Sequence, residues 1–211
     1  MVNRCQSFVE TRNLKFGTNP NPTKSKTKCV VFSKKKSKIK PMSILLNDDV
    51  LPWVTEVFHL GSLLQADNSM RKDITRKRCI FNNKCNSLLQ EFYAASPSVI
   101  MKCINTYASS FPSSQLWNVD SNESERLYKS WNVLVRQVFG LDRKTHRSLI
   151  EPVSKVLHLK TMLCSRMVKF SLKLRECPKF TTRFLANMFS TDLRVHLEEI
   201  LHTLPSYVMF R

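Results

Sequence analysis

The chain has 211 residues, of which 42% are apolar and 24% are charged, a balance typical of a globular protein. Its apolar runs are shorter than the ~18 residues that cross a bilayer, and its start lacks the apolar core of a signal peptide, so no membrane-spanning or secreted protein is expected. With 34 Lys and Arg against 16 Asp and Glu, the net charge of +18 predicts a polyanionic partner.

The first third of the chain is expected to form one helix and a small antiparallel sheet. Residues 2–14 have the periodicity of a helix that should end before Gly17. Short apolar segments bounded by turn residues predict strands, and residues 47–49 predict a turn between the strand 43–46 and the segment that holds Pro52 and Trp53. The expected strands are 30–32, 43–46 and those within 56–64.

From about residue 70 onward the sequence predicts helices, in keeping with a total of only three glycines. Apolar side chains recur there at helical spacing. The expected inward residues are Ile74, Phe81, Cys85, Leu88 and Phe92 in a first helix, Val99, Ile100, Cys103, Ile104, Tyr107 and Phe111 in a second, Leu127, Trp131, Leu134, Val135 and Val138 in a third that ends near Gly140, and Leu159, Leu163, Met167, Phe170 and Leu174 in a fourth from about 155 to 177.

The order of these elements predicts an α+β fold that is mostly α. A short N-terminal helix and a small antiparallel sheet should precede a helical bundle. We expect one domain at residues 1–68, a helical domain at 69–177 and a helical tail of unknown role at 178–211.

The positive charge is concentrated near the start of the chain. Residues 1–47 hold eleven Lys or Arg against a single acid, Glu10. Eight lysines lie between Lys24 and Lys40, on both sides of the apolar segment 29–32, which has the composition of a buried strand. A strand flanked in this way would hold its cations at fixed positions, which suits a phosphate backbone. A solvated loop is an equally good interpretation.

Two predicted helices also carry basic residues. The first helix begins with five cations, which oppose the helix macrodipole, so contact with an anion is one explanation for them. Residues 155–175 contain six bases and no acid, which favours a nucleic-acid-binding face over an ordinary solvated one. These cations are Arg71, Lys72, Arg76, Lys77 and Arg78 in the first helix, and Arg166, Lys169 and Lys173 in the fourth.

The cysteines and histidines do not predict a metal site. None of the seven cysteines forms a Cys-x-x-Cys pair, and no two of the five histidines are four residues apart. We expect the cysteines to be reduced, mostly buried, small apolar residues of an intracellular protein. The lysine cluster 34–40 could serve as a nuclear-localisation signal.

Several segments, in their order and spacing, resemble the end of the palm and the thumb of non-LTR (LINE-type) retrotransposon reverse transcriptases. The resemblance covers roughly residues 1–175 and departs from the family at Asp142, where these proteins often have proline. The segments are Leu14-Lys15-Phe16, 19–32 beginning Asn19-Pro20, Val57-Phe58-His59-Leu60-Gly61, Lys84-Cys85-Asn86, Trp131-Asn132-Val133 and 140–147.

This resemblance implies roles for matching positions. Lys24, with Lys26 as the rival, would lie near the phosphates of an incoming nucleotide. Leu60-Gly61 would form the primer-grip turn, where glycine permits a close backbone approach. The basic thumb helix would follow the phosphates of an RNA–DNA hybrid or duplex without reading bases. The expected nucleic-acid-binding residues are Lys24, Lys26, Lys28, Leu60, Gly61, Arg71, Lys72, Arg76, Lys77, Arg78, Arg166, Lys169 and Lys173.

The carboxylates that polymerisation requires are not expected in this chain. Nucleotidyl transfer needs them to hold two Mg²⁺ ions about 4 Å apart. In the family they precede the Asn-Pro element, and here the sole acid before it is Glu10. The pair Asp48-Asp49 follows that element and lacks the preceding aromatic residue. We therefore expect a truncated fragment with no catalytic residue and no polymerase activity, because Mg²⁺ binding belongs to the intact parent enzyme.

Two other functions compete with this interpretation. The chain could be a basic helical interaction protein that docks to an acidic partner and has no enzymatic role. A hydrolase is the weakest alternative, because His146 and Cys164 supply a base and a nucleophile but no neighbouring residue in the sequence activates either.

Overall fold

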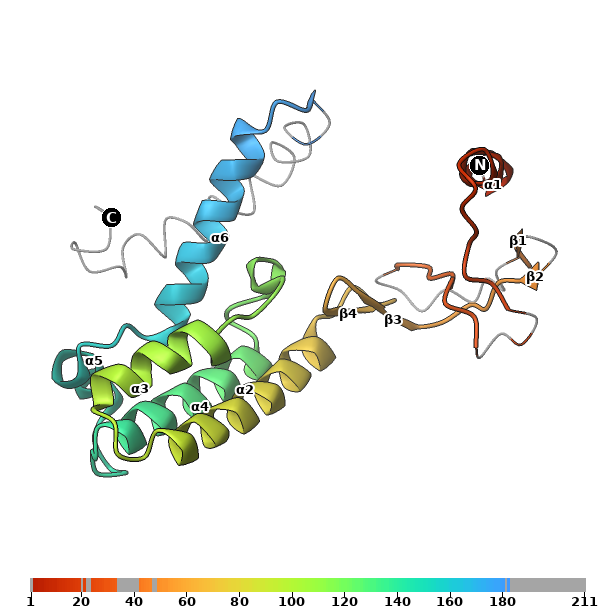
Figure 1. Ribbon diagram of the computed structural model, residues 1–211. Helices are drawn as coiled ribbons and strands as arrows, with labels where there is room; N and C mark the ends of the chain where they lie inside the picture. Colours follow the sequence, from red (N-terminus) through yellow and green to blue (C-terminus); the bar gives the residue numbers. More distant parts are fainter. Residues whose placement is uncertain are drawn as a thin grey trace. The chain divides into compact units, whose positions relative to one another are not determined.

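The computed structural model describes residues 2–19, 21, 24–33, 42–46, 49–180 and 182. The elements confirm the expected fold class, α+β and mostly α (Figure 1). They are α1 (Val2–Glu10), β1 (Leu45–Leu46), β2 (Asp49–Val50), β3 (Glu56–His59), β4 (Ser62–Gln65), α2 (Arg71–Glu91), α3 (Pro97–Cys103), the π-helix η1 (Ile104–Ala108), the 3-10 helix η2 (Ser114–Leu116), α4 (Asn122–Val138), α5 (Arg147–Ser154) and α6 (Leu159–Glu176).

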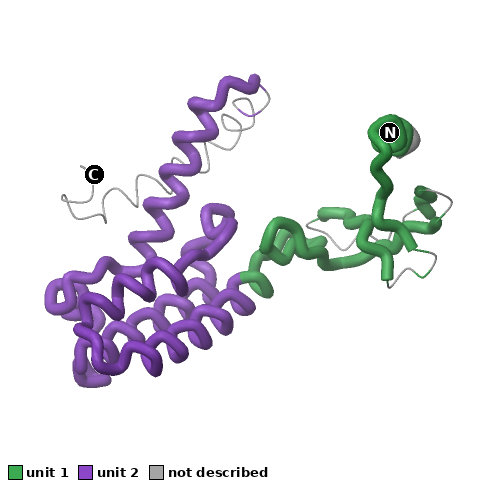
Figure 2. Tube along the Cα trace, viewed as in Figure 1, with its two compact units in different colours: residues 1–73 green, residues 74–211 purple. Residues whose placement is uncertain are grey.

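The chain divides into two compact units, residues 1–73 and 74–211 (Figure 2). The division falls in the first turn of α2, a few residues after the expected boundary at residue 68. Most of the expected tail, 178–211, lies outside the described residues, as does the lysine cluster 34–40.

The first unit contains two small antiparallel pairs. Strand β1 pairs with β2, opposing Leu46 to Asp49, and β3 pairs with β4 from Glu56↔Gln65 to His59↔Ser62. The strands expected within 43–46 and 56–64 are therefore confirmed, while Asn47 and Asp48 of the expected turn lie outside the described residues.

The buried strand expected at residues 30–32 does not form. Cys29 makes one parallel bridge to Trp53: its N–H donates to the carbonyl of Pro52 at 3.0 Å, and its carbonyl accepts from Val54 N–H at 2.9 Å. No ladder follows, and the side chains of Val31 and Phe32 are half exposed. This prediction was wrong because β-type composition indicates an extended chain but not a partner for it.

Aromatic rings join the helices of the second unit. Figure 1 shows α2, α3 and α4 side by side. The ring of Phe81 on α2 lies 6.0 Å from that of Trp131 on α4 and 5.7 Å from that of Phe111, which in turn lies 5.6 Å from Trp117. All four are buried, so this cluster forms the centre of the core.

Helix α4 follows its predicted pattern closely. Its five expected inward residues are all buried. The side chain of Ser121 accepts from Ser124 N–H at the N-terminus, two glutamates occupy the first turn, and the helix ends just before Gly140, whose φ is +62°. Each of these features stabilises a helix end.

The helix expected from about 155 to 177 forms as α6, which begins four residues later at Leu159, and a helix that was not expected, α5, precedes it. Lys155 adopts a left-handed conformation with φ +55°, which ends α5. Helix α6 begins at Leu159, which is fully buried like Leu163, while the expected inward residues further along α6 are only partly buried. The second predicted helix begins as the α-helix α3, which ends at Cys103, and continues as the π-helix η1 to Ala108.

Candidate nucleic-acid interface

The lysine segment of the first unit is tied to Gly17. The carbonyl oxygen of Gly17 accepts from Lys26 N–H at 2.8 Å, from Thr27 N–H at 3.1 Å and from the hydroxyl of Ser25 at 3.4 Å. A Cβ on Gly17 would lie 3.1 Å from the Cβ of Lys26, so a larger residue would push this segment away. The glycine therefore allows a close backbone approach here.

This attachment turns the three lysines outward. Lys24, Lys26 and Lys28 are exposed, whereas the intervening Ser25 is buried and Thr27 is half-buried. None of the three forms an ion pair with a carboxylate of the described residues. Three cations at alternate positions thus face solvent, as a phosphate contact requires.

The β3–β4 hairpin presents an exposed tip. Leu60 and Gly61 form its two-residue loop with φ of +46° and +80°, the positive values that a type I′ turn needs. Leu60 is 84% exposed and Phe58 is 64% exposed. The hairpin belongs to the same unit as the lysine segment, because Ser33 N–H, just beyond that segment, donates to Ala66 carbonyl at 2.8 Å after β4.

Acidic residues compensate the cations at the start of α2. Asp73, in the first turn, is fully buried and accepts from Leu63 N–H at 3.0 Å, and Lys72 forms an ion pair with Glu56. A carboxylate in the first turn stabilises a helix. The basic start of α2 therefore does not require a bound anion for its stability, and of its five cations only Arg71 and Lys72 are exposed.

Two of the expected phosphate contacts have internal partners. Lys77 is only 5% exposed, its ammonium donates to the carbonyl of Pro112 and it lies 5.4 Å from the centre of the Trp117 ring. Arg166 is half-buried and donates from Nη2 to Ser109 carbonyl at 3.1 Å, and burial lowers the pKa of its guanidinium. Both side chains hold loops of the second unit in place, which does not suit the role expected of them.

The remaining expected residues are dispersed. Arg76 and Arg78 are half-buried on α2, and Lys169 and Lys173 are exposed on α6. The expected residues that lie in the first unit are Lys24, Lys26, Lys28, Leu60, Gly61, Arg71 and Lys72.

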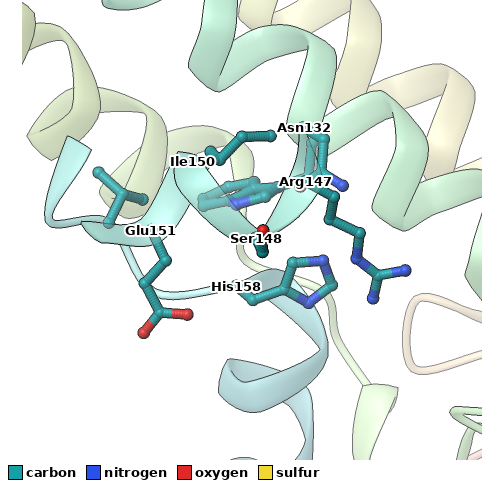
Figure 3. Close-up of a pocket in the computed structure, with 8 residues that line it drawn as sticks. Asn132, Arg147, Ser148, Ile150, Glu151 and His158 are labelled. Atoms are coloured by element: carbon teal, nitrogen blue, oxygen red, sulfur yellow. The ribbon is translucent and has the colours of Figure 1, made fainter. Parts of the chain in front are cut away.

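A pocket in the second unit was not expected from the sequence. It has a volume of about 180 Å³ and lies where α4, α5 and the start of α6 meet (Figure 3). Its lining includes Trp131, Asn132, Arg147, Ile150 and His158. Among the described residues no group of three or more His, Cys, Asp or Glu could hold a metal ion.

His158 is the N-cap of α6 and is kept neutral by its surroundings. Its Nδ1 accepts from Lys160 N–H at 3.2 Å. Burial, together with the nearby cations of Arg147 and Lys160, lowers the pKa of its imidazole to about 4. Its ring lies 5.6 Å from that of Tyr128.

This shift predicts that acid destabilises the second unit. Between the unfolded pKa near 6.5 and the folded pKa of about 4, the unfolded chain binds a proton that the folded chain does not. The free energy of unfolding should therefore fall as pH decreases through this window.

Urea unfolding at pH 7.0, 5.5 and 4.5 measures the slope of this free energy against pH. The slope should be shallower in His158→Asn, which removes the imidazole while asparagine still caps the helix. His146→Asn, at the exposed N-cap of α5, is the matched control. Equal slopes in the wild type and His158→Asn would contradict the prediction.

The pair considered for hydrolysis lacks an activated nucleophile. Cys164 is buried and its thiol pKa is raised, chiefly by burial, which disfavours the thiolate. His146 accepts hydrogen bonds from Ser148 through Nδ1.

No described helix is long and apolar enough to cross a membrane.

No protein-family model matches the sequence, and neither a curated protein nor a solved structure matches the chain.

Proposed function

We propose that the chain binds nucleic acid through its phosphate backbone, without reading the base sequence, as the palm edge and thumb of a non-LTR reverse transcriptase would. The observation that carries this proposal is the row of outward-facing lysines, Lys24, Lys26 and Lys28, on the segment held by Gly17. The proposal assigns binding and not polymerisation to these residues. The only Asp-Asp pair in the sequence, Asp48-Asp49, follows the Asn-Pro element, whereas the metal-binding carboxylates of the family precede it.

The hairpin tip adds a second type of contact. Lysines neutralise phosphates, while exposed apolar and aromatic side chains contact bases and sugars, and proteins that hold nucleic acid without sequence preference combine the two. The exposed rings and methyl groups of Phe58 and Leu60 lie in the same unit as the lysines. This combination favours nucleic acid over an acidic protein surface, which would need the cations alone.

Replacing the three lysines by glutamine should weaken binding of an RNA–DNA hybrid and reduce its salt dependence. Each phosphate contact contributes about 0.9 to the slope of log K against log[salt], so losing three should lower the slope by about 2.7. Fluorescence anisotropy with a labelled hybrid between 50 and 200 mM salt measures both quantities.

The matched control replaces Lys102, Lys129 and Lys144, three exposed lysines of the second unit that are not among the expected contacts. Both variants lose the same net charge, so only a local role separates them. Equal losses would show diffuse attraction and overturn the assignment to the lysine segment. Absence of hybrid and duplex binding at low salt would overturn the proposed function and leave the acidic protein partner.

A further inference from the structure

The pocket of the second unit contains two buried polar atoms without a partner. Oδ1 of Asn132, a residue 6% exposed, and Nε2 of His158 have no hydrogen-bond partner among the described residues, and both residues line the pocket. An unpaired buried polar atom lowers the stability of the folded protein, because the hydrogen bond it made with water is lost and not replaced. A ligand that pairs both atoms recovers this cost, so the pocket is prepared for a polar molecule.

The hydrogen-bond pattern of the ligand follows from these atoms. Because Nδ1 of His158 accepts from Lys160 N–H, the proton of the neutral ring is on Nε2, which is a donor. Oδ1 of Asn132 is an acceptor. The pocket therefore offers one donor and one acceptor, and its complement is an edge with a carbonyl oxygen beside an N–H.

The size and the walls of the pocket restrict the ligand further. A cavity of about 150 Å³ holds benzene, so about 180 Å³ accommodates one six-membered ring. Trp131 and Ile150, both buried, supply an apolar wall. Figure 3 shows the Arg147 side chain beside His158 and the carboxylate of Glu151 directed away from both.

Arg147 supplies a cation at the edge of the pocket. Its side chain is 53% exposed, and its described ion pair with Glu125 is long, at 4.0 Å. A guanidinium held this loosely can take a phosphate in bidentate fashion. A ring with an amide-like edge and an attached phosphate is a nucleotide.

We propose that this pocket binds one uracil or thymine nucleotide, with the ring N–H donating to Asn132 Oδ1, a ring carbonyl accepting from His158 Nε2 and the phosphate at Arg147. The nucleotide is either an unpaired residue of a bound strand or a free nucleotide. The first source rests on the proposed function, and the second is independent of it.

The experiment uses the full chain and uridine 5′-monophosphate in isothermal titration calorimetry. Binding should weaken on the order of 10-fold in Asn132→Leu, which removes the acceptor at nearly constant size, and in Arg147→Gln. Asn122→Leu, an exposed position of the same helix, should bind like the wild type. The 3-methyluridine monophosphate, whose N–H is blocked, should also bind on the order of 10-fold more weakly.

Each contrary result overturns the proposal. These are absence of binding at millimolar uridine monophosphate, equal affinity for the 3-methyl compound, or wild-type affinity in Arg147→Gln, an exposed position whose change leaves the core intact. Binding of a short acidic peptide in place of the nucleotide would assign the pocket to a protein partner and would also overturn it.

Two further arms separate the sources and the two proposals. If the nucleotide comes from a strand, Asn132→Leu should also weaken binding of a short oligouridine; if it is free, only the monophosphate should be affected. The triple lysine variant should bind uridine monophosphate normally. If uridine monophosphate does not bind while the hybrid still binds in a salt-dependent way, the pocket proposal is overturned and the proposed function is not.

Discussion

Replacing Trp131 with alanine should lower the free energy of unfolding of the second unit by about 3–5 kcal/mol. The indole is 1% exposed and stacks against Phe81 at 6.0 Å, so its removal leaves a cavity that the surrounding aromatic cluster cannot close. Since domains are stable by about 5–15 kcal/mol, this change should remove much of the stability of the unit.

Urea unfolding followed by circular dichroism measures the effect. Val133→Ala is the matched control, because Val133 lies two residues further along α4 and is 60% exposed. Its free energy of unfolding should change by less than about 0.5 kcal/mol. A loss below about 1 kcal/mol in Trp131→Ala would contradict the packing described for α2 and α4.

Replacing Lys77 with glutamate should be comparably damaging, at about 3–5 kcal/mol, because it places an uncompensated charge in a buried site. The ammonium of Lys77 meets the carbonyl of Pro112 and the face of Trp117, and both repel a carboxylate. Lys77→Met keeps the apolar stem and loses the hydrogen bond to Pro112 and the contact of the ammonium with the Trp117 ring, so its cost should be about 1–2 kcal/mol. Chemical denaturation of both variants measures the difference.

Arg71→Glu is the control for charge reversal on the same helix. Arg71 is exposed at the first position of α2, so its reversal should change stability little. Lys77→Met should also bind an RNA–DNA hybrid like the wild type if its ammonium is structural. A several-fold loss of binding at unchanged stability would show that Lys77 contacts phosphate.

The sequence predicted the helices where apolar spacing was regular. The pattern of α4 is uninterrupted from Leu127 to Val138, and each of its expected inward residues is buried. The same spacing explains the placement of Lys77, which lies three residues after Ile74 and four before Phe81 and so shares their buried face. Its charge favoured solvent, but a long stem can be buried when the ammonium reaches a carbonyl.

Arg166 follows the same rule on α6. It lies three residues after Leu163 and four before Phe170, and its guanidinium reaches Ser109. In both cases the helical spacing indicated a buried position, whereas the positive charge suggested exposure to solvent. The exposed lysines 24, 26 and 28 were predictable because their alternation with small polar residues matches the observed alternation of exposure.

The pocket could not be predicted because it depends on contacts between distant elements. The spacing of Asn132 from Tyr128 and Val135 marks it as buried, but nothing local indicates what it faces. That depends on α5, a short helix with Pro152 inside it, a residue that usually argues against a helix. The end of α5 at Lys155 requires a left-handed residue that the sequence does not mark with glycine or asparagine.

The hairpin turn of the first unit has a consequence for protein engineering. At the first turn position, where asparagine or aspartate is preferred, the chain has a leucine with positive φ and 84% exposure. A branched apolar side chain there is unfavourable both for the backbone, by about 1–2 kcal/mol, and for solvation. The first unit is therefore less stable than it would be with a residue that favours positive φ at this position. A substitution at Leu60 can raise its stability without changing the core.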